Sequence, residues 1–562
     1  MSTNGMPINV DVIVPVHNAE ETVKETVHSA LNQWIPRRLL TSSDGTLSNV
    51  DIDVAVCCHD DGSTDDSLRI LKEIKACHEH QSTATNGNPG TRNNDDPSER
   101  SQDGTIPGGR RIRTRLLIGS NADGVARGAG FARNRAAELR CHSNDSDNSV
   151  TTSFLCLLDS DDIMHHNRIA EQLNVMLSTP QDDVEDTRDR TLLGCTFDRI
   201  PAGSTWHYSE WANGLTDERL LLERYREVTL LQPTWFLTRS RFEQLGGYVE
   251  APHPNHQDSM KNEPLEETGA KDNISDAPSE CYRLIHPIHD NAHTLRLAED
   301  LRFFHEHLRA SGLLKLYRHG PSDKPLVTYR HRVGQSQSSS TPRKLLLNLR
   351  VMAFEDNILR VHPRWADGFV IWGAGRDGKD FFKSLSPGIR ARVQCFADVD
   401  EKKITAGFYA NPDLGAKIPI VHFSLLATDP NVRSDHADAD AHADLSFGRI
   451  SKNRKKGGDV NVEVDTISNG SGSFCGVLAG KRARTETTVD DATEEDITAR
   501  RPKKRQRKLH NLGPKDAKKL DVESLPGLPV VVCVAMYRTN GVLESNVRSI
   551  GRIEGETLWH FS

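Results

Sequence analysis

The sequence predicts an α/β fold, because short, nearly continuous apolar runs alternate with amphipathic helical segments. Three runs, VDVIVPV at 10–16, DVAVCC at 53–58 and FLCLLD at 154–159, have the composition of buried, mainly parallel strands. The segments EETVKETVHSALNQW and DDSLRILKEIKAC, which follow the first two runs, each gather apolar side chains on one helical face. This repeat predicts a sheet with helices packed against it.

Length and composition predict two domains with long insertions. A chain of 562 residues is longer than one hydrophobic core usually supports, yet only 36% of the residues are hydrophobic. Several segments rich in Asn, Asp, Ser, Gly and Pro lack periodicity and are predicted to be surface insertions, disordered in part. These segments are 78–110, 142–152, 177–190, 251–290 and 427–524.

The charge balance excludes any general case for nucleic-acid or anionic-membrane binding. The net charge of −8 comes from 71 basic and 79 acidic residues mixed along the chain. The first residues lack a basic stretch followed by an apolar one, and no window approaches ~18 apolar residues, so we expect no membrane span and a cytoplasmic location. The basic tract RRPKKRQRK at 500–508 resembles a nuclear localisation signal, although a solvated loop is the favoured interpretation.

Acidic residues follow the second predicted strand in the segment HDDGSTDDS. Asp60 and Asp61 come at the carboxyl end of this strand, the edge at which parallel α/β sheets bind ligands. A carboxylate there can accept a hydrogen bond from a nucleotide base or a ribose hydroxyl. Taken alone, a solvated turn with a helix cap explains these residues better.

The third predicted strand ends in a denser acidic group, LLDSDD. Asp159, Asp161 and Asp162 would repel one another unless a cation lay between them. Hard carboxylate oxygens suit Mg2+ or Mn2+ that is shared with substrate phosphates. The alternative is a capped loop, but the crowding of acids beside a buried strand favours a metal.

Six motifs together resemble the family 2 glycosyltransferases, because they occur in the order typical of that family. They are VDVIVPVHNAEETVKETVHSALNQ, HDDGSTDDS, NADGVARGAGFARNRA, LLDSDD, LLQPTWFLTRSRFEQLGGY and AEDLRFFHEHLR. The resemblance implies a GT-A fold over residues 1–345 and inverting transfer of a sugar from a UDP-sugar. The later segments HPRWADGFVIWGAGRDGKDFFKSL and EGETLWHFS are similar to members that transfer N-acetylglucosamine, which favours UDP-GlcNAc. The acceptor stays open.

The resemblance also implies roles for individual residues. Pro15 would line the uridine pocket and Asp61 would recognise the base. Asp159 and Asp161 match the two acids of the DxD motif and would hold Mn2+ or Mg2+. Asp162 would contact the metal or the donor sugar. Arg133 belongs to the helix that runs beside the donor, with helix packing as an equally good interpretation.

A second set of roles concerns the acceptor and the chemistry. Asp300, in the Glu-Asp pair of AEDLRFFHEHLR, matches the family's catalytic base, whereas without the other motifs an acidic helix start would suffice as an explanation. The residues of QPTW would form the acceptor side, and the segment YRHR would reach the diphosphate. The residues concerned are Gln232, Thr234, Trp235, Arg330 and His331. For Trp235, stacking on a sugar and burial in the core are equally good interpretations.

A glycine motif predicts a second, Rossmann-like domain. The segment FVIWGAGRDGKDFF carries Gly373, Gly375 and Gly378 between a strand and a helix, and Asp398 ends the next apolar run. We expect this domain to cover 366–426 and 525–562, after a helical connection at 346–365 and around the insertion at 427–524. A nucleotide could bind at the glycines, but the unit is short for a dinucleotide.

Two other functions are compatible with parts of the sequence. The glycine motif alone would fit an NAD(P)-dependent oxidoreductase, which leaves the acids around Asp159 and Asp300 without a role. A non-catalytic scaffold with a transferase fold would not require those acids to be kept. The favoured interpretation is therefore a metal-dependent glycosyltransferase.

Overall fold

The computed structural model describes most of the chain, in ranges that are separated by several long segments. The described residues are 7–41, 47–48, 50–85, 109–140, 152–178, 184–251, 292–320, 323–332, 341–429, 520–534 and 541–561. Large parts of the predicted insertions at 142–152, 251–290 and 427–524 lie outside them, as does the basic tract at 500–508. None of the described helices combines the length and the apolarity that crossing a membrane requires.

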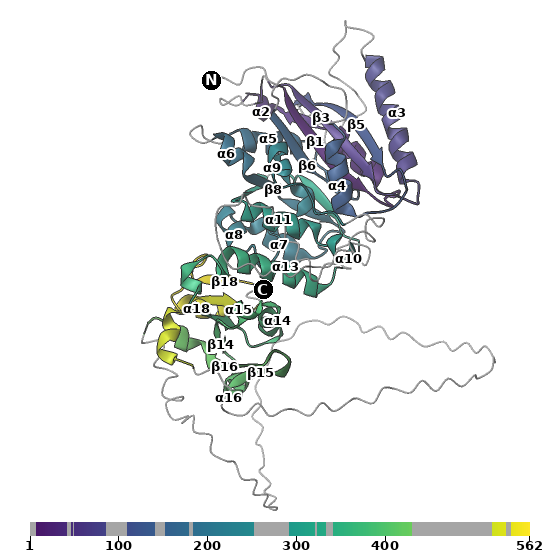
Figure 1. Cartoon of the computed structure of the whole chain (residues 1–562). Coiled ribbons are helices and arrows are strands. Elements are labelled where there is room, and N and C mark those ends of the chain that lie inside the picture. The colour runs from purple at the N-terminus through teal and green to yellow at the C-terminus, as the bar shows by residue number, and fades with distance from the viewer. Residues whose placement is uncertain are drawn as a thin grey trace, which may run out of the picture. The chain divides into compact units, whose positions relative to one another are not determined.

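The first half of the described chain contains a seven-stranded sheet (Figure 1). Its order is β11 (Leu313–Tyr317), β8 (Thr191–Cys195), β10 (Phe236–Thr238), β6 (Thr152–Leu157), β1 (Ile8–Val16), β3 (Ile52–Asp60) and β5 (Arg113–Ser120). Strand β1 runs parallel to both β3 and β6, whereas β10 is antiparallel to its neighbours. The three predicted apolar runs are thus adjacent strands, and the prediction of a mixed α/β fold is confirmed.

Two hydrophobic clusters cover the two faces of this sheet, because alternate residues of a strand point in opposite directions. On one face, Val10, Val12 and Val14 of β1 join a cluster that includes residues of α1 (Val23–Leu31) and α3 (Ser67–Thr85). On the other face, Ile13 joins a cluster with residues of α4 (Ala129–Glu138) and α11 (Glu299–Arg309). This double burial explains why β1 reads as an almost unbroken apolar run.

The remaining elements of this part surround the sheet. The helices are α2 (Arg37–Thr41), α5 (Arg168–Leu177), α6 (Val184–Asp189), α7 (Trp206–Gly214), α8 (Asp217–Leu222), η3 (Gln232–Thr234), α9 (Arg239–Gln244) and α10 (Ala292–Leu295). One small sheet has the order β7 (Ile163–Met164), β12 (Val327–Arg330) and β9 (Phe197–Ile200), and another pairs β2 (Trp34–Pro36) with β4 (Gly109–Arg111).

Some predicted boundaries were wrong. The first helix ends at Leu31, and Trp34 starts β2 instead of ending the helix. Helix α3 continues through Thr85 into the segment predicted as an insertion from residue 78. The segment 177–190 contains α6. Polar sequence alone did not distinguish a solvated helix from a loop in these places.

A second sheet of six strands follows a run of helices, α13 (Arg343–Phe354), η5 (Glu355–Leu359) and η6 (Pro363–Trp365). Its order is β15 (Phe408–Asn411), β16 (Ala416–His422), β14 (Val393–Asp398), β13 (Phe369–Trp372), β17 (Val530–Val532) and β18 (Leu558–His560). Its helices are α14 (Arg376–Ser384), α15 (Pro387–Arg390), α16 (Glu401–Ala406), η7 (Pro412–Leu414), η8 (Phe423–Leu426), η10 (Val522–Gly527) and α18 (Val542–Ser549). The strands before residue 427 and after residue 524 therefore share one sheet, although its identity as a Rossmann-like domain stays a prediction.

The close packing of the glycine motif can be tested by substituting one of its glycines and measuring stability. A Cβ added at Gly378 of α14 would lie 1.9 Å from the Gly373 carbonyl oxygen, so the helix could not keep its place against β13. We expect Gly378→Ala to lower the free energy of unfolding by about 1–3 kcal/mol, measured by chemical denaturation. The control is Gly388→Ala in α15, where nothing lies within 4 Å of the added atom and an effect below about 1 kcal/mol is expected. Equal effects of the two substitutions would contradict the close packing at Gly378.

Candidate active site

The carboxyl ends of three parallel strands bring the predicted donor-binding segments together. In the register of the sheet, Pro15 of β1 lies opposite His59 of β3, and Ile13 lies opposite Leu157 of β6. The loops that follow these strands therefore leave the sheet at a common edge. Thr22 and Thr26 fix the third loop, since both hydroxyls donate to the Ser160 carbonyl oxygen at 3.0 Å.

Asp61 is buried at this edge and is bonded within the chain. Its carboxylate accepts the backbone N–H groups of Arg127 and Gly128 at 2.7–2.9 Å and the side-chain amide of Asn121 at 2.7 Å. Asp61 thus holds the loop that leads into α4 against the end of β3. Recognition of a base by Asp61 stays a prediction, as does the lining role of Pro15, which is buried within β1.

The acidic group after β6 is crowded and partly open to solvent. The side chains of Asp159 and Asp161 are 27% and 34% exposed, whereas Asp162 is fully buried. Asp162 Oδ1 accepts the backbone N–H of Arg330 at 2.8 Å, and its Oδ2 is buried with no hydrogen-bond partner. Two solvent-facing carboxylates and one buried carboxylate therefore share a single turn.

Crowding alters the acidity of these groups. Burial and the charge of Asp159 raise the pKa of Asp161 to about 6, and Arg332 opposes the shift. Burial and the charges of Asp159 and Asp161 raise the pKa of Asp162 well above its ordinary value. Like charge and burial thus make ionisation of Asp161 and Asp162 harder, although Arg332 opposes the effect at Asp161.

A buried arginine joins this acidic group to the predicted catalytic pair. Arg133 of α4 donates to Asp159 Oδ1 at 2.6 Å and to Glu299 Oε1 at 2.8 Å, and its guanidinium lies 5.5 Å from the Tyr248 ring. Burial alone would lower the pKa of Arg133, but the two carboxylates raise it above its ordinary value. Arg133 is therefore a charged link between β6 and α11, and the predicted position of its helix beside the donor stays a prediction.

Asp300 follows Glu299 in the first turn of α11 and is half-buried. Its Oδ1 accepts the N–H of Leu301 at 2.7 Å. Burial and the charge of Glu299 raise the pKa of Asp300 to about 7, while the Leu301 N–H and Arg133 oppose the shift. The preceding Ala298 has φ 55, a left-handed conformation that costs a non-glycine residue roughly 1–2 kcal/mol and fixes how the helix begins.

Strand β12 brings basic residues to the acidic group. The side chain of Arg330 binds Glu25 at 2.7 Å, while its backbone N–H binds Asp162 as described above. His331 donates its backbone N–H to the Ile200 carbonyl oxygen at 2.8 Å. Arg332, which sequence reasoning missed, has its Nε 3.7 Å from Asp161 Oδ2. Its position follows from the pairing of β12 with β7 and β9, which no local pattern announces.

The predicted acceptor residues after Leu231 are core residues. Trp235 is fully buried, packs against Phe303 and Phe304, and donates its indole N–H to the Leu230 carbonyl oxygen at 2.8 Å. Thr234 is fully buried, and Gln232 donates to the Tyr248 hydroxyl at 2.9 Å. The interpretation of Trp235 as a sugar platform was therefore wrong for this structure, and the alternative of a core tryptophan is correct.

The residues present are chemically suited to a divalent cation that substrate phosphates and water also bind. Among the described residues, no group of three or more His, Cys, Asp or Glu side chains is arranged to hold a metal ion. A partly hydrated Mg2+ or Mn2+ bound with a diphosphate needs only one or two carboxylates. Asp159 and Asp161 offer these, and their mutual repulsion is the kind that a cation relieves.

The glycine motif of the second sheet forms a closed hydrogen-bond network. Asp398 accepts the N–H groups of Ala374, Val399 and Asp400, and binds Lys403 Nζ at 2.9 Å. Burial alone would raise the pKa of Asp398, but these donors bring it below its ordinary value. The Asp398 carboxylate thus joins the ends of β13 and β14, and nucleotide binding at the glycine motif stays a prediction.

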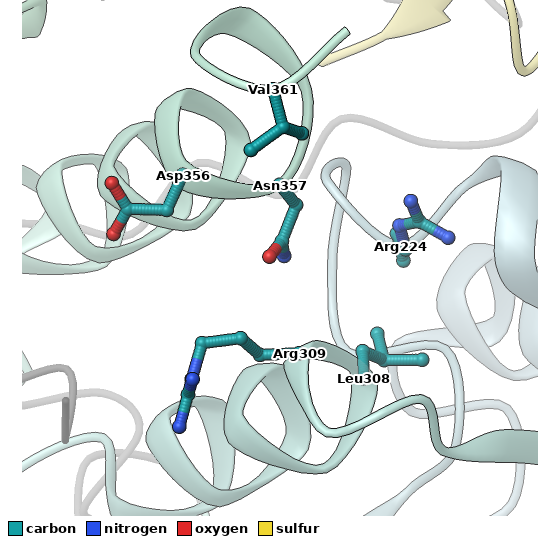
Figure 2. A pocket seen from close by; sticks show the side chains of 6 residues that line it. All are labelled: Arg224, Leu308, Arg309, Asp356, Asn357 and Val361. Carbon is teal, nitrogen blue, oxygen red and sulfur yellow. The ribbon is translucent and has the colours of Figure 1, made fainter. Parts of the chain in front are cut away.

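One cavity lies apart from these acids, near the C-terminal end of α11 (Figure 2). Figure 2 shows Asn357 of η5 pointing across the space toward the helix that carries Leu308 and Arg309. The lining residues are Arg224, Leu308, Arg309, Asp356, Asn357 and Val361. Because no acid of the candidate site lines it, this cavity is not part of the site.

Comparison with known proteins identifies the first part of the chain. Residues 11–92, which include β1, β3 and the Asp61 loop, match the model of the family described as Glycosyl transferase family 2. The similarity to family 2 glycosyltransferases is thus established over these residues. A curated relative, poly(ribitol-phosphate) beta-glucosyltransferase of Bacillus spizizenii, is 30% identical over 92 residues, which are 16% of this chain and 12% of the relative. The family 2 match covers two of the three strands at the site edge, whereas the relative is matched over a small part of its length.

Two solved structures are similar at low levels. S. aureus TarS in complex with UDP-GlcNAc has 13% identity and a TM-score of 0.32, with 69% of this chain and 84% of that chain covered. The mannosyltransferase PcManGT from Pyrobaculum calidifontis, in complex with GDP-Man and Mn2+, has 12% identity and a TM-score of 0.30 over 63% of this chain and 65% of that chain. At these values they add nothing about substrates.

The link through Arg133 predicts a large and local stability effect. Arg133→Met would leave Asp159 and Glu299 without their buried partner, so we expect the free energy of unfolding to fall by about 3–5 kcal/mol. Arg135→Met, two residues along the same helix, removes a side chain that is 33% exposed and pairs with Glu138 and Glu250, so a loss below about 1 kcal/mol is expected. Denaturant unfolding of both variants at neutral pH checks this. If the two losses were similar, the buried link would not be a main support of the site.

Proposed function

We propose that the chain is an inverting glycosyltransferase that moves a sugar from a UDP-sugar to an acceptor hydroxyl. The observation that carries this proposal is the link through Arg133, which joins the acids after β6 to the Glu-Asp pair of α11 in one site. The family 2 match over residues 11–92 supports the same reaction class. The similarity of the segments HPRWADGFVIWGAGRDGKDFFKSL and EGETLWHFS to members that transfer N-acetylglucosamine favours UDP-GlcNAc as donor. The name of the Bacillus relative supports a hexose with a β-linked product.

Asp300 is proposed as the general base. The acceptor oxygen attacks the anomeric carbon, the bond from that carbon to the diphosphate oxygen breaks, and UDP departs with the bonding electrons. The proton of the acceptor hydroxyl passes to Asp300, whose Oδ1 is already oriented by the Leu301 N–H. A base with a pKa of about 7 is well matched to neutral pH, because about half of it is ionised there and the ionised form still binds the proton firmly.

Asp159 and Asp161 are proposed to hold the donor diphosphate through Mg2+ or Mn2+. When bound, the cation supplies positive charge against the charge that develops on the leaving UDP. Arg332, beside Asp161, is a further group able to bind phosphate oxygen. Glu299 is assigned no proton transfer, because its pairing with Arg133 gives it a positioning role for Asp300.

No observation favours the alternative of a nicotinamide-dependent oxidoreductase. Such an enzyme would use the loop at Gly373 and Gly375, with Asp398 free to meet a ribose. In this structure the Asp398 carboxylate already accepts hydrogen bonds from the chain. A non-catalytic scaffold is the remaining alternative, and the experiments below distinguish it from an enzyme.

The donor assignment is tested by a screen of nucleotide sugars. With purified full-length protein and Mn2+, we expect UDP release from UDP-GlcNAc to exceed release from other UDP-sugars and release of GDP from GDP-mannose. EDTA and Asp161→Asn should each weaken UDP binding by at least tenfold in calorimetry, because both remove the charge that holds the diphosphate. Asp413→Asn, in η7 between β15 and β16, is the control. Equal UDP affinity in Mn2+, in EDTA and in Asp161→Asn would remove the metal from the mechanism.

Asp300 is tested by Asp300→Asn, which keeps the shape of the side chain but cannot take a proton. We expect transfer to fall by roughly 10²-fold or more, a typical contribution of a positioned base, while UDP affinity stays unchanged. Loss of UDP binding together with turnover would instead assign Asp300 to the donor or metal site. Nearly intact turnover would exclude Asp300 as the base, and Glu299→Gln would then be the next variant to measure.

The pH profile gives a second readout of the same group. Because the base must be ionised, kcat/KM for the acceptor should rise through about pH 7 and level off above it. The pKa of Asp300 in the folded protein lies above its value in the unfolded chain. Protonation of Asp300 therefore stabilises the fold fully below about pH 4, and this contribution to the free energy of unfolding is lost as the pH rises through about 7. Asp300→Asn should flatten both the kinetic rise and part of this decline in stability.

A further inference from the structure

Trp206 is a large apolar side chain that lies in solvent at the first position of α7. It is 54% exposed, in contrast to the fully buried Trp235. A single exposed tryptophan is not unusual by itself. Trp206 is of interest because of its position relative to the acids of the candidate site.

The segment before Trp206 lies at the acidic group. Strand β9 runs parallel to β12, with Ile200 opposite Arg330. The Ile200 carbonyl oxygen accepts the His331 N–H, and the Arg330 N–H binds Asp162. The chain therefore leaves β9 at the same end at which β12 meets the acids, and six residues later it reaches Trp206.

The helix that begins at Trp206 packs against β12. The guanidinium of Arg199 is 5.3 Å from the centre of the Tyr208 ring and 4.6 Å from the centre of the Tyr329 ring, so α7 and β12 are held together. Tyr329 precedes Arg330, whose backbone N–H binds Asp162. The start of α7 is therefore joined to the strand that meets the acidic group.

The ring of His207 lies beside that of Trp206, with 3.5 Å between centroids and 30° between planes. Two aromatic rings are therefore exposed together at the start of α7. Indole offers a broad apolar face with a polar N–H at its edge, a surface suited to the C–H face of a pyranose ring and its hydroxyls.

We propose that Trp206 is the stacking platform for a pyranose ring of the acceptor, which makes the acceptor a saccharide. This inference rests on the proposed function and specifies the substrate class of the same site. A linear polyol phosphate, the substrate class in the name of the Bacillus relative, has no ring face to cover the indole. The platform thus predicts a preference for ring-bearing acceptors over such a polymer.

The test measures acceptor use and donor use separately. Trp206→Ala and Trp206→Phe are compared with wild type and with Phe408→Ala, which removes a 41% exposed aromatic ring from the second sheet. The assays are UDP affinity by calorimetry, hydrolysis of UDP-GlcNAc without acceptor, and transfer to methyl β-pyranosides and to poly(ribitol phosphate). Trp206→Ala should raise KM for the pyranosides about tenfold, corresponding to about 1.4 kcal/mol, and leave UDP affinity and hydrolysis within twofold. Trp206→Phe should recover most of the loss, and Phe408→Ala should behave as wild type.

Several outcomes would overturn the platform. Unchanged pyranoside KM in Trp206→Ala, or faster transfer to poly(ribitol phosphate) than to any pyranoside, would contradict it. Loss of UDP affinity in Trp206→Ala would assign the residue to the donor side instead. If wild type released UDP from no donor, the proposed function would fail. Saturation-transfer NMR of the pyranosides with wild type and Trp206→Ala would then decide whether the ring binds sugar, and equal signals from both proteins would exclude it.

Discussion

The candidate site depends on one buried guanidinium between two carboxylates. Arg133 is 3% exposed, and a charge so removed from water is tolerated only where opposite charges compensate for the lost hydration. Asp159 and Glu299 supply that compensation from the end of β6 and the start of α11. The charge requirement thus fixes the separation of two elements that lie 140 residues apart in sequence, taking Asp159 and Glu299 as the ends. Asp300 follows directly, so its position depends on the same link.

The carboxylates outside that link remain in conflict with one another. Burial and neighbouring charge raise the pKa of Asp161 to about 6 and of Asp300 to about 7. The two groups face different demands, however. The side chain of Asp161 is 34% exposed and has Asp159 and Arg332 as charged neighbours. Asp300 is half-buried and has Glu299, which pairs with Arg133, as its charged neighbour. These two environments are the basis of the different roles that we propose for the two carboxylates.

The sequence predicted the positions of acids that lie next to a strand end or a helix start. The run FLCLL is apolar because β6 is buried, so the acids after it had to emerge at the edge of the sheet. The acids of α11 could be placed because they open an amphipathic helix. The sequence was not informative about which side of an element faces a ligand, and for that reason Trp235 was assigned to the acceptor side although it packs against Phe303. Arg332 and Trp206 escaped notice because their positions depend on the pairing of β9 with β12.

Acidic residues at the carboxyl ends of buried strands have two different environments in this structure. Asp61 follows a buried strand and Asp398 ends one, and each accepts backbone N–H groups of a neighbouring loop. Asp159 and Asp161 follow a buried strand as well, but they retain exposure and lie beside one another, with Arg133 bound to Asp159 and Arg332 near Asp161. A carboxylate that accepts several N–H groups is already stabilised in its ionised form, whereas one beside another carboxylate gains from any cation that approaches. Local hydrogen bonding, and not position after a strand, therefore separates the acids that hold loops from those available to a ligand.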